Sequence, residues 1–455
     1  MIKKVLIANR GEIAVRIIRA CREMGIETVA VYSTEDADQL HVKISNEAVC
    51  IGKPRSSDSY LNMPALMNAA YATGCDAVHP GYGFLAENAE FADLVEQCGM
   101  KFIGPSGKII SQMGDKIVAR ELMEKNGVPT VPGSKGVLEN ASEAKVLADE
   151  IGYPVLIKAA GGGGGKGMRS VFKAEDFERE FENARQEAVS AFQSGDMYLE
   201  KLVLNPKHIE IQILADSHGN VIHLGERECS IQRKNQKMIE ESPSPFVNSK
   251  LREEMGAIAV KAAQACNYVN AGTVEFVVDQ EGNFYFIEMN TRIQVEHPVT
   301  EMVTDVDIIK EQLRIASGLA LKYKQEDIEL RGHAIECRVN AERPVMNFMP
   351  STGRVGFYNP PGGMGTRFET YLYNGCKISP YYDSMIGKII VVGKTRLEAI
   401  RKMRRAIEET YIDGIETNLA LQYSILHDFD FLRGDYDTGF MEEKLDSMLE
   451  MIKGM

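Results

Sequence analysis

Hydrophobic and polar positions along the chain follow two periods, and the changes between them mark the expected elements. An apolar run at 4–8 precedes a helical repeat over 12–24 and a second apolar run at 28–32. That order predicts a β-α-β unit with parallel strands. The same patterns predict the other elements of the first part, namely strands at 77–78 and 101–103 and helices at 63–72 and 90–97.

The middle of the chain combines helices with alternating strands. Two alternating runs, H-I-E-I-Q-I-L and V-I-H-L-G-E, flank the turn D-S-H-G-N and predict a β-hairpin. A strand-rich part begins near 332, and a charged helix at 397–409 precedes a polar tail. The remaining expected elements are helices at 116–126, 142–151 and 250–266, a long helix ending near 192, and strands at 154–159, 168–172 and 197–203.

The segment E-M-N-T-R-I-Q-V-E, at 288–296, places a polar group at every second position. Side chains of an extended segment alternate between two faces. An extended conformation therefore puts five polar side chains on one face, those of Glu288, Asn290, Arg292, Gln294 and Glu296.

The strand before this segment is expected to pair with it as a hairpin. A two-residue turn at 281–282 pairs Gln280 with Asn283, and counting outward places Glu275 opposite Glu288. Like charges in opposed positions are destabilising. A divalent cation such as Mg²⁺ or Mn²⁺ relieves that repulsion, because such ions prefer oxygen ligands. The alternative is an ordinary solvated strand face.

A run of glycines at 161–165 resembles two phosphate-binding motifs and satisfies neither. The P-loop motif requires Gly and Ser or Thr where this chain has Ala160 and Gly167. A GxGxxG pattern is present, but an expected strand follows it instead of the helix that dinucleotide binding requires. We interpret the run as a flap between antiparallel strands, in which backbone N–H groups, Lys158 and Lys166 approach phosphate. A flexible linker is the alternative.

Composition excludes several classes of protein. The chain has 455 residues, 44% hydrophobic and 26% charged, as is ordinary for a globular protein of several domains. A net charge of −13 argues against a nucleic-acid or membrane-surface binder. The eight cysteines form no CxxC pair, which favours free thiols in the cytoplasm. No apolar stretch has the length of a signal peptide core or a membrane span.

Six segments, in this order, resemble the biotin carboxylases of the ATP-grasp superfamily over nearly the whole chain. They are I-A-N-R-G-E-I-A-V-R (7–16), H-P-G-Y-G-F-L-A-E-N (79–88), I-K-A-A-G-G-G-G-G-K-G-M-R (157–169), E-C-S-I-Q-R-K-N-Q-K (228–237), E-M-N-T-R-I-Q-V-E-H-P-V-T-E (288–301) and Y-Y-D-S-M-I-G-K (381–388).

The resemblance implies a fold that mixes α/β and α+β classes in three domains. These are a Rossmann-like N-terminal domain at 1–114, an ATP-grasp domain at 115–330 with a flap subdomain at about 131–203, and a β-rich C-terminal domain at 331–445. The reaction it implies has two steps. ATP phosphorylates bicarbonate to carboxyphosphate, and the CO₂ derived from it carboxylates the N1′ ureido nitrogen of biotin.

The resemblance also assigns residues to ATP and to metal. It implies that Glu275, Glu288 and Asn290 bind two Mg²⁺ or Mn²⁺ ions, which agrees with the hairpin argument. The strand of Glu200, Lys201, Leu202 and Val203 is expected to read adenine through its backbone. The other expected ATP contacts are Lys116, Lys158, Gly163, Gly164, Gly165, Met168, His208, Gln232 and Asn235.

For the other substrates, the resemblance implies a bicarbonate pocket in which Glu296 is the base. The remaining pocket residues are Lys237, Arg292, Gln294 and Val295. Arg338 is expected to stabilise the biotin enolate, and Tyr82 to lie beside biotin. Without the resemblance, His208 is a solvated histidine, Tyr82 a loop aromatic, and Arg338 one half of a structural ion pair with Glu336.

Two positions differ from the family pattern. Lys166 and Asn235 stand where bacterial stand-alone members have arginine and histidine. Lysine keeps the charge but loses bidentate geometry, and asparagine cannot carry a charge. Asn235 is therefore expected to contact ATP by hydrogen bonding alone.

The chain contains no A-M-K-M-type biotinylation motif, so its biotin is expected on a separate carrier protein. The expected partners are that carrier, carboxyltransferase subunits and a second copy of the chain. Acetyl-CoA carboxylase is the simplest context, and a pyruvate or other acyl-CoA carboxylase is the alternative. A different ATP-grasp ligase and a non-catalytic nucleotide-binding scaffold remain open as further alternatives.

Overall fold

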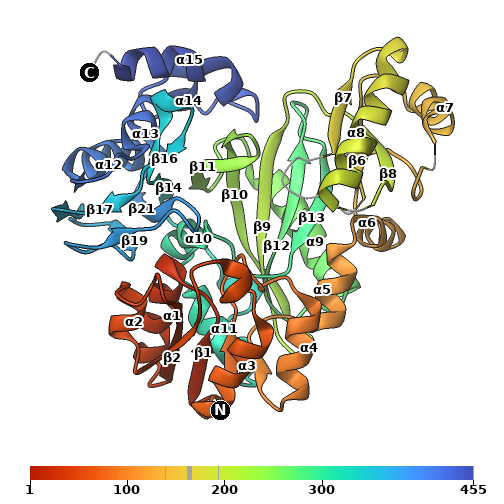
Figure 1. The fold of residues 1–455 in the computed structure, drawn as a ribbon. Helices are drawn as coiled ribbons and strands as arrows, with labels where there is room; N and C mark the ends of the chain where they lie inside the picture. The colour runs from red at the N-terminus through yellow and green to blue at the C-terminus, as the bar shows by residue number, and fades with distance from the viewer. Residues whose placement is uncertain (139, 161–166, 193, 454–455) are drawn as a thin grey trace.

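The fold is taken from a computed structural model of the chain (Figure 1). The structure describes residues 1–138, 140–160, 167–192 and 194–453. The glycines assigned to ATP phosphates, Gly163 to Gly165, and the neighbouring Lys166 lie outside the described residues. In the described ranges no helix is long and apolar enough to cross a membrane.

A parallel sheet forms the N-terminal part, as the β-α-β pattern predicts. Its strand order is β3-β2-β1-β4-β5, and every neighbouring pair is parallel. The short α2 (Leu40–Ile44) and β3 were not expected from the pattern. The strands are β1 (Lys4–Ile7), β2 (Glu27–Ser33), β3 (Glu47–Gly52), β4 (Ala77–His79) and β5 (Lys101–Phe102), and the longer helices are α1 (Gly11–Glu23), α3 (Met63–Ala72), α4 (Ala89–Gln97) and α5 (Gly107–Gly114).

A smaller lobe follows α6 (Lys116–Lys125) and stands beside the rest of the molecule, at the upper right of Figure 1. Its three-stranded sheet has the order β7-β6-β8, and β6 pairs antiparallel with both neighbours. The glycine run therefore connects antiparallel strands, as predicted. The elements of the lobe are α7 (Ala141–Ile151), β6 (Val155–Ala159), β7 (Met168–Val171), α8 (Phe177–Phe192) and β8 (Met197–Lys201).

An eight-stranded sheet forms the centre of the molecule, in the order β13-β12-β9-β10-β11-β14-β21-β19. The predicted hairpin around D-S-H-G-N is confirmed as β9 paired with β10. The strands are β9 (Lys207–Ala215), β10 (Val221–Arg233), β11 (Gln236–Ser242), β12 (Asn270–Val278), β13 (Phe284–Asn290), β14 (His333–Asn340), β19 (Thr366–Thr370) and β21 (Met385–Gly393), and the helices beside them are α9 (Ser249–Ala265), α10 (His297–Thr304) and α11 (Ile308–Ala316).

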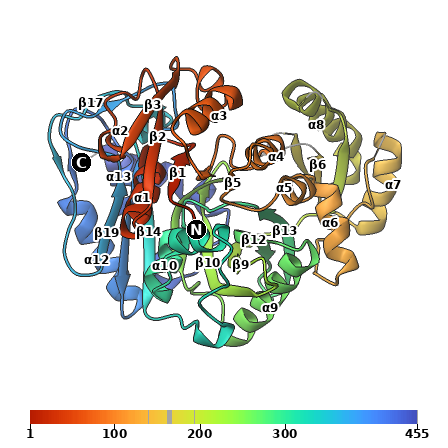
Figure 2. The same cartoon turned by 90° about the horizontal axis from the view of Figure 1, so that it is seen from below.

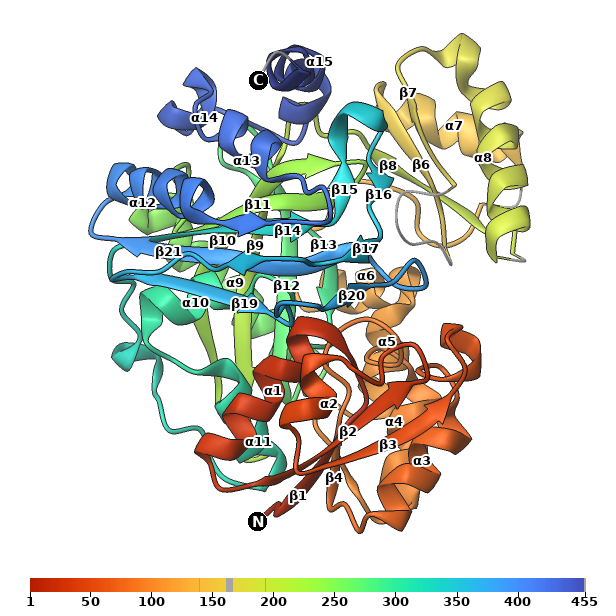
Figure 3. The same ribbon diagram turned by 60° about the vertical axis from the view of Figure 1, so that its left-hand side comes forward.

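This central sheet continues across the domain boundary expected near residue 330. β11 pairs with β14, and β14 pairs with β21, so strands from the middle and the end of the chain are hydrogen-bonded neighbours. Figure 3 shows the continuation, and Figure 2, the view from below, shows α10 next to β14 and β10 of the same sheet. The boundary residues themselves stay a prediction.

The end of the chain is helical, so the expectation of a polar tail is wrong. After the predicted helix α12 (Arg396–Glu409) come α13 (Leu419–Ile425), α14 (Phe429–Arg433) and α15 (Phe440–Lys453). Their apolar side chains, including Phe431, Phe440 and Met448, are buried in the core that also contains β14 and β21. The charged residues between these positions obscured the helical spacing.

Candidate active site

One large cavity lies between the N-terminal part, the small lobe and the central sheet. Its volume is about 1100 Å³. Every candidate site residue from the sequence that the structure describes lines this cavity. They are Tyr82, Lys116, Lys158, Met168, Glu200, Lys201, Leu202, Val203, His208, Gln232, Asn235, Lys237, Glu275, Glu288, Asn290, Arg292, Gln294, Val295, Glu296 and Arg338.

The predicted opposition of Glu275 and Glu288 is confirmed in the pairing of β12 with β13. The route to it differs from the predicted two-residue turn. The Asp279 backbone N–H donates to the Asn283 carbonyl at 2.9 Å, and Val278 pairs with Phe284, which shifts the register by one residue. A bulge between Glu275 and Phe276 shifts it back. The two offsets cancel, so the carboxylates still face each other.

The extended conformation expected up to Glu296 ends earlier. β13 stops at Asn290, and the chain then turns into α10, with Glu296 as the N-terminal flanking residue of that helix. Arg292 and Gln294 nevertheless line the cavity, while Ile293 packs in an apolar core. Alternation therefore predicted the positions of Arg292, Gln294 and Ile293 correctly, but Val295, expected on the opposite face, also lines the cavity, and the segment after Asn290 is not a strand.

Lys237 on β11 joins three buried carboxylates. Its Nζ lies 2.6 Å from Glu210 Oε2, 3.1 Å from Glu275 Oε1 and 2.6 Å from Glu296 Oε1. Burial alone would lower the pKa of Lys237, but these carboxylates raise it well above its usual value. Lys237 is therefore a permanent cation that pairs both with Glu275, a residue expected to bind metal, and with Glu296, a residue expected to bind bicarbonate.

Glu296 stays ionised despite its burial, with only 2% of its surface exposed. Burial would raise its pKa, but the charges of Lys237, Arg338 and Arg227 together hold the pKa well below the usual range. This carboxylate is available as a proton acceptor at neutral pH, and its affinity for the proton is low.

Beneath the cavity lies an arginine that the sequence reading missed. Arg227 on β10 is fully buried and pairs with Glu210. It also donates to the side-chain oxygens of Gln212, Gln294, Thr273 and Thr300 at 2.7 to 3.1 Å. Gln294 in turn donates to Glu275 Oε1 at 2.6 Å. Arg227 thus holds Gln294 in place, and through Gln294 it is linked to Glu275.

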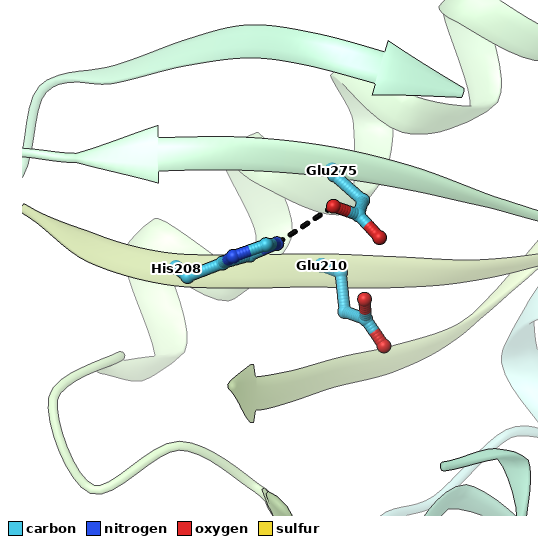
Figure 4. Close-up of side chains that lie close together, drawn as sticks. All are labelled: His208, Glu210 and Glu275. Atoms are coloured by element: carbon cyan, nitrogen blue, oxygen red, sulfur yellow. Dashed lines mark hydrogen bonds and ion pairs between the residues drawn. The ribbon is translucent and has the colours of Figure 1, made fainter. Parts of the chain in front are cut away.

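Glu210 was also missed, although the signal was present. It follows His208 by two positions on β9 and is the cross-strand partner of Glu275. Figure 4 shows His208, Glu210 and Glu275 together, with His208 Nε2 2.7 Å from Glu275 Oε2. The alternation of H-I-E-I-Q predicts that His208 and Glu210 share a face.

A divalent cation fits the oxygen donors at the Glu275 and Glu288 pair. Carboxylate and amide oxygens are the ligands that Mg²⁺ and Mn²⁺ prefer, and Asn290 supplies the amide. Glu288 is partly exposed toward the cavity, 3.9 Å from Lys116 Nζ. In the tighter group of His208, Glu210 and Glu275, Lys237 pairs with both carboxylates and Arg227 pairs with Glu210 as well.

At the lobe end of the cavity, charged groups surround Glu200. Lys158 Nζ lies 2.5 Å from Glu200 Oε2, and Arg120 Nη1 lies 3.0 Å from Glu200 Oε1. The Glu200 carboxylate is therefore occupied by these cations. Arg120 was not expected from the sequence.

Asn235 lies at the tip of the hairpin formed by β10 and β11. Its φ is 61°, and that of the preceding Lys234 is 49°. Asparagine is enriched in this left-handed conformation. Asparagine at position 235, where relatives were expected to have histidine, therefore fits the left-handed backbone of this turn.

The opposite end of the cavity contains Tyr82 and Arg338. The Tyr82 hydroxyl donates to Glu12. Arg338 lies 2.5 Å from Glu240 Oε1 and 3.1 Å from Glu296 Oε2. The suggested structural pair of Arg338 with Glu336 is not observed among the described residues. Arg292 Nε lies 2.8 Å from Glu87 Oε2, and this ion pair was not expected from the sequence.

Comparison with known sequence families matches three successive segments of the chain. The descriptions are "Biotin carboxylase, N-terminal domain" for residues 1–110, "Carbamoyl-phosphate synthase L chain, ATP binding domain" for 115–324, and "Biotin carboxylase C-terminal domain" for 336–443.

Full-length relatives and solved structures are similar to the chain. Biotin carboxylase 1 of Bacillus subtilis is 58% identical over 97% of this chain and 98% of its own length. The 2-oxoglutarate carboxylase small subunit of Hydrogenobacter thermophilus is 53% identical over 97% and 94%. The biotin carboxylase–β,γ-ATP complex from Campylobacter jejuni has a TM-score of 0.95 at 49% identity, covering 97% of this chain and 99% of that one.

Proposed function

The chain belongs to the biotin carboxylase family and is an ATP-dependent ligase that carboxylates biotin with bicarbonate; from this premise we propose the roles of its cavity residues. ATP and Mg²⁺ are the nucleotide and metal of this family. The observation that carries the proposed roles is the position of Lys237, within 3.1 Å of both Glu275 and Glu296.

The nucleotide end binds and orients ATP. The backbone of 201–203 reads the adenine, while Lys116 and Lys158 hold phosphate oxygens. Glu275, Glu288 and Asn290 hold the divalent cations, which neutralise phosphate charge when bound. Phosphoryl transfer depends mainly on positioning and charge neutralisation, so lysines that converge on the phosphates supply what the reaction requires.

Bicarbonate binds between Lys237, Arg292 and the 294–296 segment. Glu296 accepts the bicarbonate proton as the bicarbonate oxygen attacks the γ-phosphorus and ADP leaves. The low pKa of Glu296 makes it a weak base, and the surrounding cations offset this by raising the acidity of bound bicarbonate. The product is carboxyphosphate, which releases CO₂ and phosphate.

Biotin occupies the Tyr82 and Arg338 end. The phosphate released from carboxyphosphate accepts the N1′ proton of biotin. The negative charge then lies on the ureido oxygen, and the planar, permanently charged guanidinium of Arg338 is suited to stabilise it. The enolate nitrogen then attacks CO₂. Arg338 is already fixed by Glu240 and Glu296, so little side-chain freedom is lost when biotin arrives.

The proposal extends to partners and context. The biotin is carried by a separate carrier protein and passes its carboxyl group to carboxyltransferase subunits, with acetyl-CoA as the first candidate acceptor. Relatives named for 2-oxoglutarate and pyruvate keep other acceptors open. A relative crystallised as a dimer supports a homodimer, and eight free cysteines support a cytoplasmic location.

A steady-state assay of ADP formation tests the proposed function. ATP hydrolysis is expected to require bicarbonate and Mg²⁺ or Mn²⁺ and to rise when free biotin is added. Full turnover in EDTA, or no response to bicarbonate and biotin, would overturn it. A non-catalytic scaffold gives no turnover at all. A different ATP-grasp ligase responds to an amine or carboxylate substrate and not to biotin.

A further inference from the structure

Lys388 ends the Y-Y-D-S-M-I-G-K segment, and none of the roles above uses it. It lies on β21 and is fully buried. A buried ammonium group is costly unless it is paired and hydrogen-bonded. Its position therefore calls for partners, and the partners lie in other parts of the chain.

Those partners lie at the proposed biotin and bicarbonate subsites. Lys388 Nζ lies 3.2 Å from Glu12 Oε1 and also donates to the Val295 carbonyl oxygen. Glu12 accepts a hydrogen bond from the Tyr82 hydroxyl. The result is a continuous chain of contacts from Tyr82 through Glu12 and Lys388 to the backbone of Val295.

The chain of contacts spans three regions of the molecule. Tyr82 and Glu12 belong to the N-terminal part, Val295 to the turn before α10, and Lys388 to β21. Arg338 lies directly across from Lys388 in the pairing of β14 with β21. Each of these residues except Lys388 and Glu12 has been placed at the bicarbonate or the biotin subsite.

We propose that Lys388 is a positioning residue, which fixes the biotin subsite at Tyr82 relative to the bicarbonate subsite at Val295. This inference rests on the proposed function and deepens it. CO₂ released from carboxyphosphate is captured only when the biotin nitrogen is held close by, and a displacement of about 1 Å can cost about 10²-fold in rate. Lys388 therefore governs coupling, defined as carboxybiotin formed per phosphate released.

Substitution Lys388→Met tests the proposal. The variant is expected to hydrolyse ATP in a bicarbonate-dependent manner with an unchanged KM for ATP, because the nucleotide subsite lies at the lobe end of the cavity. Coupling is expected to fall by about 10-fold or more. Lys402→Met is the matched control, since Lys402 Nζ also donates to a carbonyl, that of Val392 at 2.8 Å, and pairs with Glu398 at 3.0 Å, but outside the cavity.

A double variant, Lys388→Met with Glu12→Gln, separates positioning from charge compensation. The pair of changes removes the unpaired buried carboxylate, while the amide oxygen introduced at position 12 still accepts from Tyr82. Thermal stability is expected to recover toward that of the wild type, and coupling is expected to stay low, because the Val295 carbonyl still lacks its donor.

The outcomes are distinguishable. Normal coupling in Lys388→Met, or coupling restored in the double variant, would overturn the positioning role. A Lys388→Met protein that fails to fold leaves the double variant to decide. Failure of the proposed function itself appears separately, as a wild-type protein with no biotin-stimulated, bicarbonate-dependent ATP hydrolysis.

Discussion

Arg338 Nη2 lies 3.1 Å from Glu296 Oε2, so the arginine proposed for biotin and the carboxylate proposed for bicarbonate form one ion pair. Each has a second partner: Glu240 for Arg338 and Lys237 for Glu296. The two chemical steps therefore share a contact without sharing all of their residues, and substitutions are expected to separate them.

Arg338→Ala is expected to lose carboxybiotin formation and to retain slow bicarbonate-dependent ATP cleavage. Lys237 still pairs with Glu296 in this variant, so carboxyphosphate can form and decay. Glu296→Ala is expected to depress both products, because bicarbonate loses its base. Phosphate and carboxybiotin are measured in parallel, and an equal product ratio in the two variants would contradict this division of roles.

Glu288→Gln is expected to keep the fold and lose activity. The substitution removes repulsion from Glu275 across the hairpin and leaves packing unchanged. Turnover is expected to fall by about 10²-fold or more, as for other lost charge-neutralising contacts. The dependence of rate on Mg²⁺ concentration is the measurement. Glu281→Gln, an exposed change in the turn of the same hairpin, is the control; unchanged turnover in Glu288→Gln would remove its metal role.

Arg227→Met is expected to destabilise the protein strongly. The change leaves the buried Glu210 carboxylate with Lys237 as its remaining cation. It also removes the hydrogen-bond donor of the Gln212 and Gln294 side-chain oxygens. Breaking a buried pair in this way typically costs about 3–5 kcal/mol. Urea denaturation measures the loss, with Arg331→Met as control because Arg331 pairs with Glu329 at the surface. Equal stability of the two variants would contradict the prediction.

Glu241 is expected to make folding sensitive to acid. Burial would raise its pKa, but Arg396 and the hydrogen bond with His333 lower it to about 2, against an ordinary value of 4.5. A carboxyl with a lowered folded-state pKa stabilises the protein above pH 4.5, and this contribution, on the order of 3 kcal/mol, disappears as pH falls toward 2.

Urea midpoints of the wild type and Glu241→Gln at pH 7 and pH 3 measure this effect. The stability gap between the two proteins is expected to narrow at pH 3. Glu326→Gln is the control, because Glu326 is exposed and Lys324, which pairs with it at 3.7 Å, is exposed as well. A gap that is the same at both pH values would be incompatible with the assigned pKa.

Local patterns predicted those features of the site that depend on neighbours in sequence. Alternation placed Arg292 and Gln294 at the cavity, and the hairpin count placed Glu275 opposite Glu288. The count succeeded although it contained an error. The turn closes one residue earlier, and a bulge compensates, because neither a three-residue loop nor a bulge has a sequence signal strong enough to count.

Contacts between distant strands escaped prediction for a physical reason. Arg227 pairs with Glu210 within the predicted hairpin, but its contact with Gln294, and that of Lys388 with Glu12, form only when distant parts of the chain come together. Strand order is a property of the whole chain, and no residue near Arg227 reveals that Gln294 will lie beside it. The helical end of the chain was missed because charged residues interrupt the apolar positions that anchor it.

The unbroken central sheet has a consequence for protein engineering. β11 and β14 are joined by the backbone pairing of Ile239 with Cys337 and of Glu241 with Ile335. A chimera of two relatives joined at residue 330 would take β11 from one relative and β14 from the other, and these two strands would still have to pair. It would also have to preserve the register that holds Arg338 near Lys237. A crossover near residue 330 therefore divides a single site, because Lys237 and Arg338 come from opposite sides of it and both pair with Glu296.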